Sequence, residues 1–142
     1  MNWPKSNLTL KRKTENGFVQ DSFDHEQYIV VKSEGKRILI SGCAHNGILN
    51  ILDRFRKLHG CNPDVVISGY HMIKKTGYEA EETELIRDVA KELRGMDTRF
   101  YTGHCTGIPA FEILREIMGS RSGICIPGIR FCFRSSFPTL FL

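Results

Sequence analysis

The sequence lacks the features that mark membrane, secreted and disulfide-stapled proteins. No apolar stretch of its 142 residues reaches the roughly 18 residues that a membrane-spanning helix needs. The opening run Met1-Asn2-Trp3-Pro4-Lys5 contains no apolar leader segment, and the five cysteines include no Cys-x-x-Cys pair. We therefore expect no membrane span, free thiols and a reducing, cytoplasmic location.

The chain also lacks concentrated positive charge. Its formal net charge is +4, and the densest basic run, Lys11-Arg12-Lys13, has no aromatic platform or recognition helix beside it. We expect this run to be a solvated turn or strand edge, and we expect no nucleic-acid partner. The composition, 41% hydrophobic and 25% charged, is typical of a soluble globular domain with a core of its own.

Strand and helix patterns alternate along most of the chain. Two runs rich in β-branched and aliphatic residues flank a turn at Gly35, which predicts a hairpin. Three later segments place apolar residues, including Leu58 and Leu85, at helical spacing, and short β-type runs separate them. A β-hairpin followed by alternating α and β elements belongs to the α/β class. We expect strands over 28–32, 37–41, 64–68, 98–102 and 123–126, and helices over 48–59, 80–94 and 109–118.

Composition divides the chain into three segments. Residues 1–20 show no clear pattern beyond a short β-type run at 8–10, and we expect an irregular amino-terminal segment. Residues 21–128 carry the α/β pattern. Residues 129–142 have no acidic residue and hold four of the nine phenylalanines. This atypical hydrophobic and basic tail fits an interface strip, a membrane-surface tail or, as we favour, sequence foreign to the original fold.

Two histidines stand where predicted strands end. His45 and His104 each follow a strand and a glycine, lie within two residues of a cysteine and precede a second glycine and a helix. Ligands gather at the carboxyl ends of strands in open α/β sheets, and imidazole both ligates metals and transfers protons at neutral pH. We therefore expect the two rings to converge. Cys43 shares an extended face with His45, so this pair suits either a metal site or an activated thiol. A buried cysteine beside a capping histidine is the structural alternative.

A third histidine, His71, follows the strand between those two. Its position is compatible with ligating a metal, contacting a substrate or filling space. The acidic residues Asp21, Asp24 and Glu26 precede the hairpin, and we expect them to form a solvated turn. His59 ends a predicted helix, where a cation complements the helix dipole, so we expect a structural role for it.

Four segments together resemble the metallo-β-lactamase (MBL) superfamily. Within it, they are most similar to MBL-fold metal-dependent hydrolases that resemble the ribofuranosylaminobenzene-phosphate synthases of methanopterin biosynthesis. The resemblance covers about residues 15 to 120. The segments are Asp21-x-Phe23-x-His25-Glu26-Gln27, Ser41-Gly42-Cys43-Ala44-His45-Asn46-Gly47-Ile48, Ser68-Gly69-Tyr70-His71-Met72 and Thr102-Gly103-His104-Cys105-Thr106-Gly107.

The resemblance implies a fold, a cofactor and a site. Members of the superfamily fold as an αββα sandwich and hold one or two metals, often zinc and sometimes iron or manganese, with a bound hydroxide as the usual nucleophile. It implies that His45 and His104 are metal ligands, with Cys43 as a third. It places His71 at the site as a catalytic residue that contacts the substrate, a small molecule that is phosphorylated or pterin-like.

The sequence departs from the superfamily in its missing metal motif. It contains no His-x-His-x-Asp-His run, and it corresponds to the carboxyl-terminal half of an MBL domain. We therefore predict half of an αββα sandwich from a truncated frame, a metal-dependent hydrolase that is weakly active or inactive alone. An uncovered sheet face predicts association with another chain. The alternatives are a pterin-pathway synthase-like protein, a non-catalytic remnant or interaction module, and a thiol enzyme that uses Cys43 or Cys105.

Overall fold

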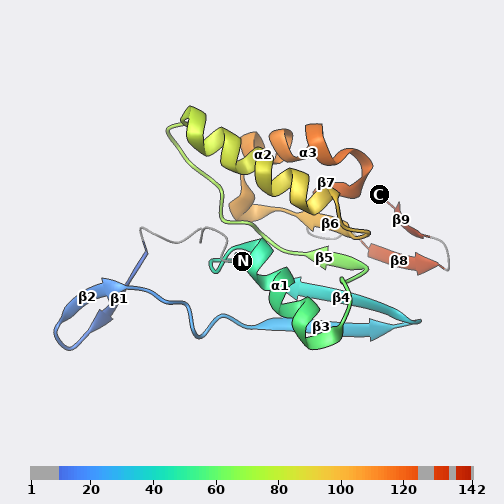
Figure 1. Ribbon diagram of the computed structural model, residues 1–142, viewed down its shortest axis with the longest axis horizontal. Helices are drawn as coiled ribbons and strands as arrows, with labels where there is room; N and C mark the ends of the chain where they lie inside the picture. The colour runs from blue at the N-terminus through green and yellow to red at the C-terminus, as the bar shows by residue number, and fades with distance from the viewer. Residues whose placement is uncertain (1–9, 125–129, 135–136, 142) are drawn as a thin grey trace.

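A mixed five-stranded sheet forms the centre of the molecule (Figure 1). The computed structural model describes residues 10–124, 130–134 and 137–141, with the backbone alone for His104 and for the last two ranges. The strand order is β3-β4-β5-β6-β7, in which β3 is antiparallel to β4 and the other neighbours are parallel. The strands are β3 (Tyr28–Ser33), β4 (Lys36–Ser41), β5 (Val65–Ile67), β6 (Arg99–Thr102) and β7 (Ser122–Ile124).

Three helices pack on one face of this sheet. They are α1 (Ile48–His59), α2 (Ala80–Arg94) and α3 (Ile108–Met118), and buried residues from all of them share one cluster with Leu39, Val66 and Phe100. Those last residues lie in one row across β4, β5 and β6, so they point to the same side of the sheet. One sheet with helices on a single face is half of an αββα sandwich, which confirms the predicted fold class.

The helices begin and end close to where the sequence predicts. Gly60, in the left-handed region at φ 69°, ends α1 and donates its N–H to the Arg56 carbonyl at 2.8 Å. At the start of α2, the Glu82 carboxylate accepts the Glu79 N–H at 2.9 Å. Leu58 is expected on the apolar face of α1 and Leu85 on that of α2, but both side chains are exposed. The buried face of each of these two helices is therefore one residue narrower than expected.

The opposite face of the sheet is partly covered. Ile38, Val65 and Tyr101 are buried there, so the expectation of an uncovered face is wrong for the middle of the sheet. Ile29 and Val31 on the edge strand β3 remain exposed.

Strands also form in two segments for which the sequence gives no clear periodicity. β1 (Lys11–Thr14) and β2 (Gly17–Gln20) pair as an antiparallel hairpin that stands away from the main sheet in Figure 1. Its basic run is exposed, as expected for a strand edge. β8 (Arg130–Arg134) and β9 (Phe137–Phe141) form a second antiparallel pair within the atypical tail. Residues 8–9 of the expected run at 8–10 and the end of the expected strand 123–126 lie outside the described residues.

None of the helices in the described ranges combines the length and the apolar character that a membrane crossing requires.

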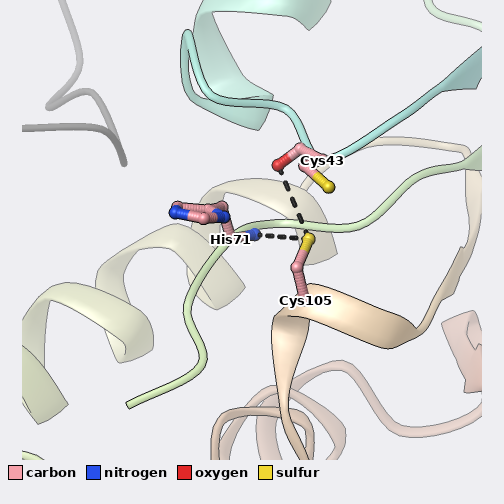
Figure 2. A group of neighbouring side chains, drawn as sticks. All are labelled: Cys43, His71 and Cys105. Carbon is pink, nitrogen blue, oxygen red and sulfur yellow. Dashed lines mark hydrogen bonds between the residues drawn. The ribbon is translucent and has the colours of Figure 1, made fainter. Parts of the chain in front are cut away.

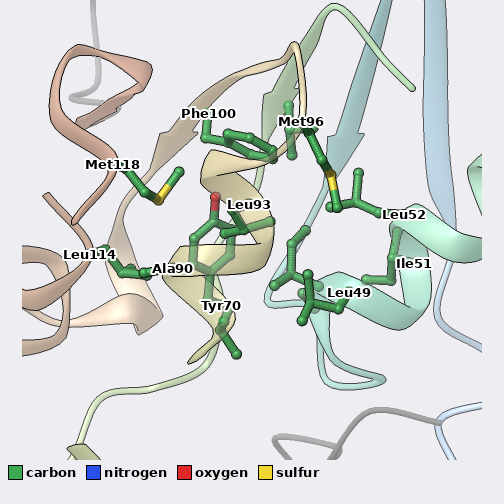
Figure 3. Packing of buried hydrophobic residues seen from close by; sticks show 14 of the residues in the cluster. Leu49, Ile51, Leu52, Tyr70, Ala90, Leu93, Met96, Phe100, Leu114 and Met118 are labelled. Atoms are coloured by element: carbon green, nitrogen blue, oxygen red, sulfur yellow. The ribbon is translucent and has the colours of Figure 1, made fainter. Parts of the chain in front are cut away.

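Tyr70 lies in the middle of the core under the helices, near Leu93 and Met118 (Figure 3). It follows β5, and only 1% of its surface is exposed. Its hydroxyl has no hydrogen-bond partner among the described residues, and burial raises its pKa. An unpaired buried hydroxyl costs free energy that the ring's apolar burial offsets.

Glu26 fixes the loop after β4. Its carboxylate accepts the N–H of His45 at 2.7 Å and the N–H of Asn46 at 3.0 Å. It also accepts the Asn46 side-chain amide at 2.8 Å and the Tyr28 hydroxyl at 2.9 Å. The expectation of a merely solvated acidic turn is therefore wrong for Glu26, which ties the segment before β3 to the loop that carries His45.

Removing the Tyr70 hydroxyl should not weaken the protein. We expect Tyr70→Phe to leave the free energy of unfolding unchanged or to raise it by about 1 kcal/mol, because an unsatisfied group is removed and the ring stays. The matched control is Tyr78→Phe, which deletes a 2.7 Å hydrogen bond to the Met72 carbonyl and should lose about 1 kcal/mol. Urea unfolding of both variants checks this, and a larger loss in Tyr70→Phe than in the control contradicts it.

Replacing Glu26 should loosen the His45 loop. We expect Glu26→Ala to lower the free energy of unfolding by about 2–3 kcal/mol, because two backbone N–H groups lose a charged acceptor. The exposed Glu15 has no such contacts within the part of the chain that the structure describes, and Glu15→Ala should stay within about 0.5 kcal/mol of the parent. Denaturant unfolding gives the stabilities, and hydrogen exchange at residues 45 and 46 reports the loop directly. Equal stabilities of the two variants would refute the assigned role.

Candidate functional site

Three loops meet at the carboxyl ends of β4, β5 and β6. We call this region the strand-end edge and define it as residues 42–47, 68–71 and 103–107. Backbone and side-chain hydrogen bonds join the loops. The Gly69 N–H donates to the Gly42 carbonyl at 2.8 Å, and the Tyr70 N–H donates to the Thr106 hydroxyl at 2.9 Å. Parallel pairing of the strands brings the three sequence motifs together at one place.

Two of the predicted site histidines touch each other at this edge. The ring centroids of His45 and His71 are 4.3 Å apart, and the His45 ring also stacks on Phe23 with the centroids 4.3 Å apart. The Nδ1 atoms of both histidines are buried and have no hydrogen-bond partner among the described residues. Burial, and then the neighbouring His45, lower the pKa of His71. Buried ring nitrogens without a partner are free to bind a cation or a substrate.

His104 begins a short 3₁₀ turn, η1 (His104–Thr106), directly after β6. This backbone position is the one that the sequence predicts. The side chain of His104 lies outside the described residues, so its convergence with His45 stays a prediction.

Two thiols join His71 at the same edge, as Figure 2 shows. The Sγ atoms of Cys43 and Cys105 and a ring nitrogen of His71 all lie within 4.8 Å of one another. The backbone N–H of His71 donates to the Cys105 Sγ at 3.3 Å. The sequence motifs predict Cys43 as a ligand and Cys105 only as a thiol nucleophile. The repeated pairing of cysteine with histidine after successive strands was the available signal for their convergence.

Gly69 makes room for the Cys105 sulfur. A Cβ atom built at Gly69 would lie 2.4 Å from the Cys105 Sγ and 3.4 Å from the Gly42 carbonyl oxygen. Any side chain at this position would therefore displace the thiol. The backbone nearby is also strained, because Ala44 and His71 adopt left-handed conformations at φ 50° and 48°. Such strain persists only where surrounding structure enforces it, and it gathers at functional sites.

A pocket of about 270 Å³ opens beside the thiols. Its lining residues come from the ends of all three strands and include Cys43, Cys105, Ser68 and Tyr101. Burial raises the pKa of the Cys105 thiol to about 11. A nucleophilic cysteine needs a lowered pKa, so this environment argues against the thiol-enzyme alternative at Cys105.

Known proteins match this chain over part of their length. It is 33% identical over 107 residues to 7,8-dihydropterin-6-methyl-4-(beta-D-ribofuranosyl)-aminobenzene-5'-phosphate synthase of Methanocaldococcus jannaschii, covering 73% of this chain and 34% of the relative. An uncharacterized protein of the same organism is 24% identical over 99 residues, which cover 70% of this chain and 34% of that protein. The chain thus spans about a third of the length of these curated relatives. No protein-family model matches it.

A solved structure shares the fold. The crystal structure of a metal-dependent hydrolase of the beta-lactamase superfamily superposes with a TM-score of 0.65 at 25% identity, over 81% of this chain and 43% of the other. The chain therefore carries part of the metallo-β-lactamase fold, and the resemblance that its motifs predicted is confirmed.

Proposed function

We propose that the strand-end edge is part of the cation site of a metal-dependent hydrolase. The proposed ligands are His45, His104 and Cys43, with His71 beside them as a catalytic residue in contact with the substrate. One observation carries the proposal: the rings of His45 and His71 touch while their buried Nδ1 atoms have no partner among the described residues. Burying two unsatisfied nitrogens side by side is costly unless a bound group uses them.

The donor chemistry fits a divalent transition metal. Imidazole and thiol side chains suit zinc, and iron or manganese are the alternatives that the superfamily offers. A cation bound here would polarise an ester or phosphoester group and lower the pKa of a coordinated water. The pocket beside Cys43 and Cys105 would admit a small-molecule substrate, for which we propose a phosphorylated or pterin-like compound.

We also propose that the site is incomplete in this chain. The sequence contains no His-x-His-x-Asp-His run, so a partner chain or a missing segment would supply further ligands. Low activity alone and association with another chain follow from this proposal. The free thiols of Cys43, Cys61 and Cys105 support a reducing, cytoplasmic location.

One specific observation favours a second candidate function. The relative matched at 33% identity is a pterin-pathway synthase, so a related synthase activity on a phosphorylated ribose derivative is the alternative. A non-catalytic interaction module is the remaining possibility.

The hydrolase proposal predicts slow, cation-dependent turnover that needs His45. We expect the full chain to cleave a chromogenic phosphodiester slowly with added Zn²⁺ or Mn²⁺, and His45→Ala to reduce that rate at least about tenfold, because a cation ligand is lost. His59→Ala is the control, because His59 packs on Phe55 at the far end of α1 and should keep the rate. No hydrolysis with any cation favours the non-catalytic alternative, and a rate unaffected by His45→Ala contradicts the proposed ligand set.

A further inference from the structure

We infer that Cys43 and Cys105 form an oxidisable thiol pair, which closes to a disulfide at the strand-end edge when it meets a small disulfide compound such as oxidised glutathione. The pair is thus a redox-dependent modification site. Disulfides in reducing compartments are mostly transient and redox-sensing, so a site of this kind agrees with the expected location. The inference deepens the proposed function as its regulation, and it rests on that proposal only for the effect of oxidation on hydrolysis.

Side-chain rotation can bring the two sulfur atoms to bonding distance. The Sγ atoms lie within 4.8 Å of each other, and the Cys105 Sγ lies 3.8 Å from the Cys43 carbonyl oxygen. Figure 2 shows the Cys105 sulfur directed toward Cys43. A disulfide bond is about 2.0 Å long, and a change of staggered rotamer moves a cysteine sulfur by roughly 3 Å. Rotation of one or both side chains therefore spans the gap.

The loop after β5 holds the two thiols together through its backbone. Gly69 donates its N–H to the Gly42 carbonyl at 2.8 Å, and His71 donates its N–H to the Cys105 Sγ at 3.3 Å. A Cβ atom at residue 69 would lie 2.4 Å from that sulfur and 3.4 Å from the Gly42 carbonyl oxygen, so the glycine keeps the space between the loops open. Two reacting groups held this closely bond in an effectively unimolecular step.

The difference in exposure sets the order in which the two cysteines react. Cys43 is half-buried, whereas only 6% of the Cys105 surface is exposed. Both residues line the pocket of about 270 Å³, which gives a small oxidant access to the pair. Cys43 therefore meets the oxidant first, and Cys105 reacts with the product of that step.

The chemistry consists of two thiol–disulfide exchanges. The Cys43 thiolate attacks one sulfur of the oxidant, which forms a mixed disulfide and releases one thiolate. The Cys105 thiolate then attacks the Cys43 sulfur and expels the second thiolate. Two electrons pass from the cysteines to the oxidant, and the two cysteine protons pass to the released thiolates. Burial raises the pKa of Cys105, but its step is intramolecular, so proximity compensates for a smaller thiolate fraction.

Closing the disulfide would change the proposed cation site. A metal is bound by the thiolate, and a disulfide sulfur no longer carries that charge. Oxidation would therefore remove Cys43 from the proposed ligands and leave His45 and His104. Reduction would restore the full set.

Peptide mapping of the oxidised full chain tests the inference without an activity assay. The five cysteines fall in five different tryptic peptides, with Cys43 in residues 38–54 and Cys105 in residues 100–115. The folded chain is treated with oxidised glutathione, its remaining thiols are alkylated, and it is digested without a reductant. We expect the cross-linked pair of these two peptides to be at least about tenfold more abundant than any other cysteine pair, because proximity favours it. It should come from the monomer band of a non-reducing gel and disappear after treatment with dithiothreitol.

Three variants and an unfolded control identify the steps. Cys105→Ser should leave Cys43 as a mixed disulfide with glutathione, because the second exchange is removed, and Cys43→Ser should abolish the cross-linked pair. Cys61→Ser is the matched control, because Cys61 lies before β5 beside Arg37, and it should leave the yield unchanged. Circular dichroism reports the fold of each variant. Oxidation in urea should distribute the pairing among the cysteines, since the fold no longer holds two of them together.

The unmodified chain alone suffices to overturn the inference. Cys61 carrying glutathione while Cys43 and Cys105 stay unlinked would do so, and so would a preferred pair that includes another cysteine or that forms only between two copies of the chain.

The hydrolysis assay tests the regulatory consequence separately. Where the reduced chain hydrolyses the phosphodiester, oxidation should lower the rate at least about tenfold and dithiothreitol should restore it, because a cation ligand is lost. A rate that oxidation leaves unchanged contradicts the regulatory role. No hydrolysis by the reduced chain, together with a normal cross-linked pair, refutes the proposed function and supports the thiol pair.

Discussion

The close approach of three loops at residue 69 is the constraint on which the site depends. The loop after β5 passes between the other two, with its N–H on the Gly42 carbonyl and the Cys105 sulfur where a Cβ would stand. Parallel pairing of β4, β5 and β6 places the loops at one edge, and the lack of a side chain at residue 69 lets them touch. Sheet topology and one glycine thus convert three distant sequence motifs into one cluster.

The hydrophobic core and the strand-end edge meet between two consecutive residues, Tyr70 and His71. This position explains the strained backbone of His71. The Tyr70 side chain is buried in the core under the helices, while the His71 side chain lies beside the thiols of Cys43 and Cys105. Extended backbone would send successive side chains to opposite faces in a regular alternation. The left-handed conformation of His71 breaks that alternation directly after the buried Tyr70. Burial of the tyrosine therefore helps to hold the histidine in a conformation that it would not adopt alone.

Much of this fold follows from the sequence, because the main sheet and helices carry strong periodic signals. The turn at Gly35, the stop at Gly60 and the apolar spacing of α1 give nearly the observed boundaries. The sequence did not predict the hairpin of β1 and β2, because its strands are only four residues long and exposed, and apolar and polar residues do not alternate along them. Hydrophobic periodicity arises from the burial of one face of an element, so it gives no signal for a strand that buries no side chains.

The candidate site was less predictable, since its contacts depend on how loops fold back. The positions of His45 and His71 after predicted strands indicate that both are candidate site residues, and the structure places their rings in contact. Nothing local to Glu26 shows that its carboxylate accepts the N–H of His45, a contact between residues 19 apart. The convergence of Cys43 with Cys105 needs the order of β4, β5 and β6, because the two cysteines are 62 positions apart. The residues that come together at the strand ends of such a fold are therefore predicted from sheet topology first and from residue spacing second.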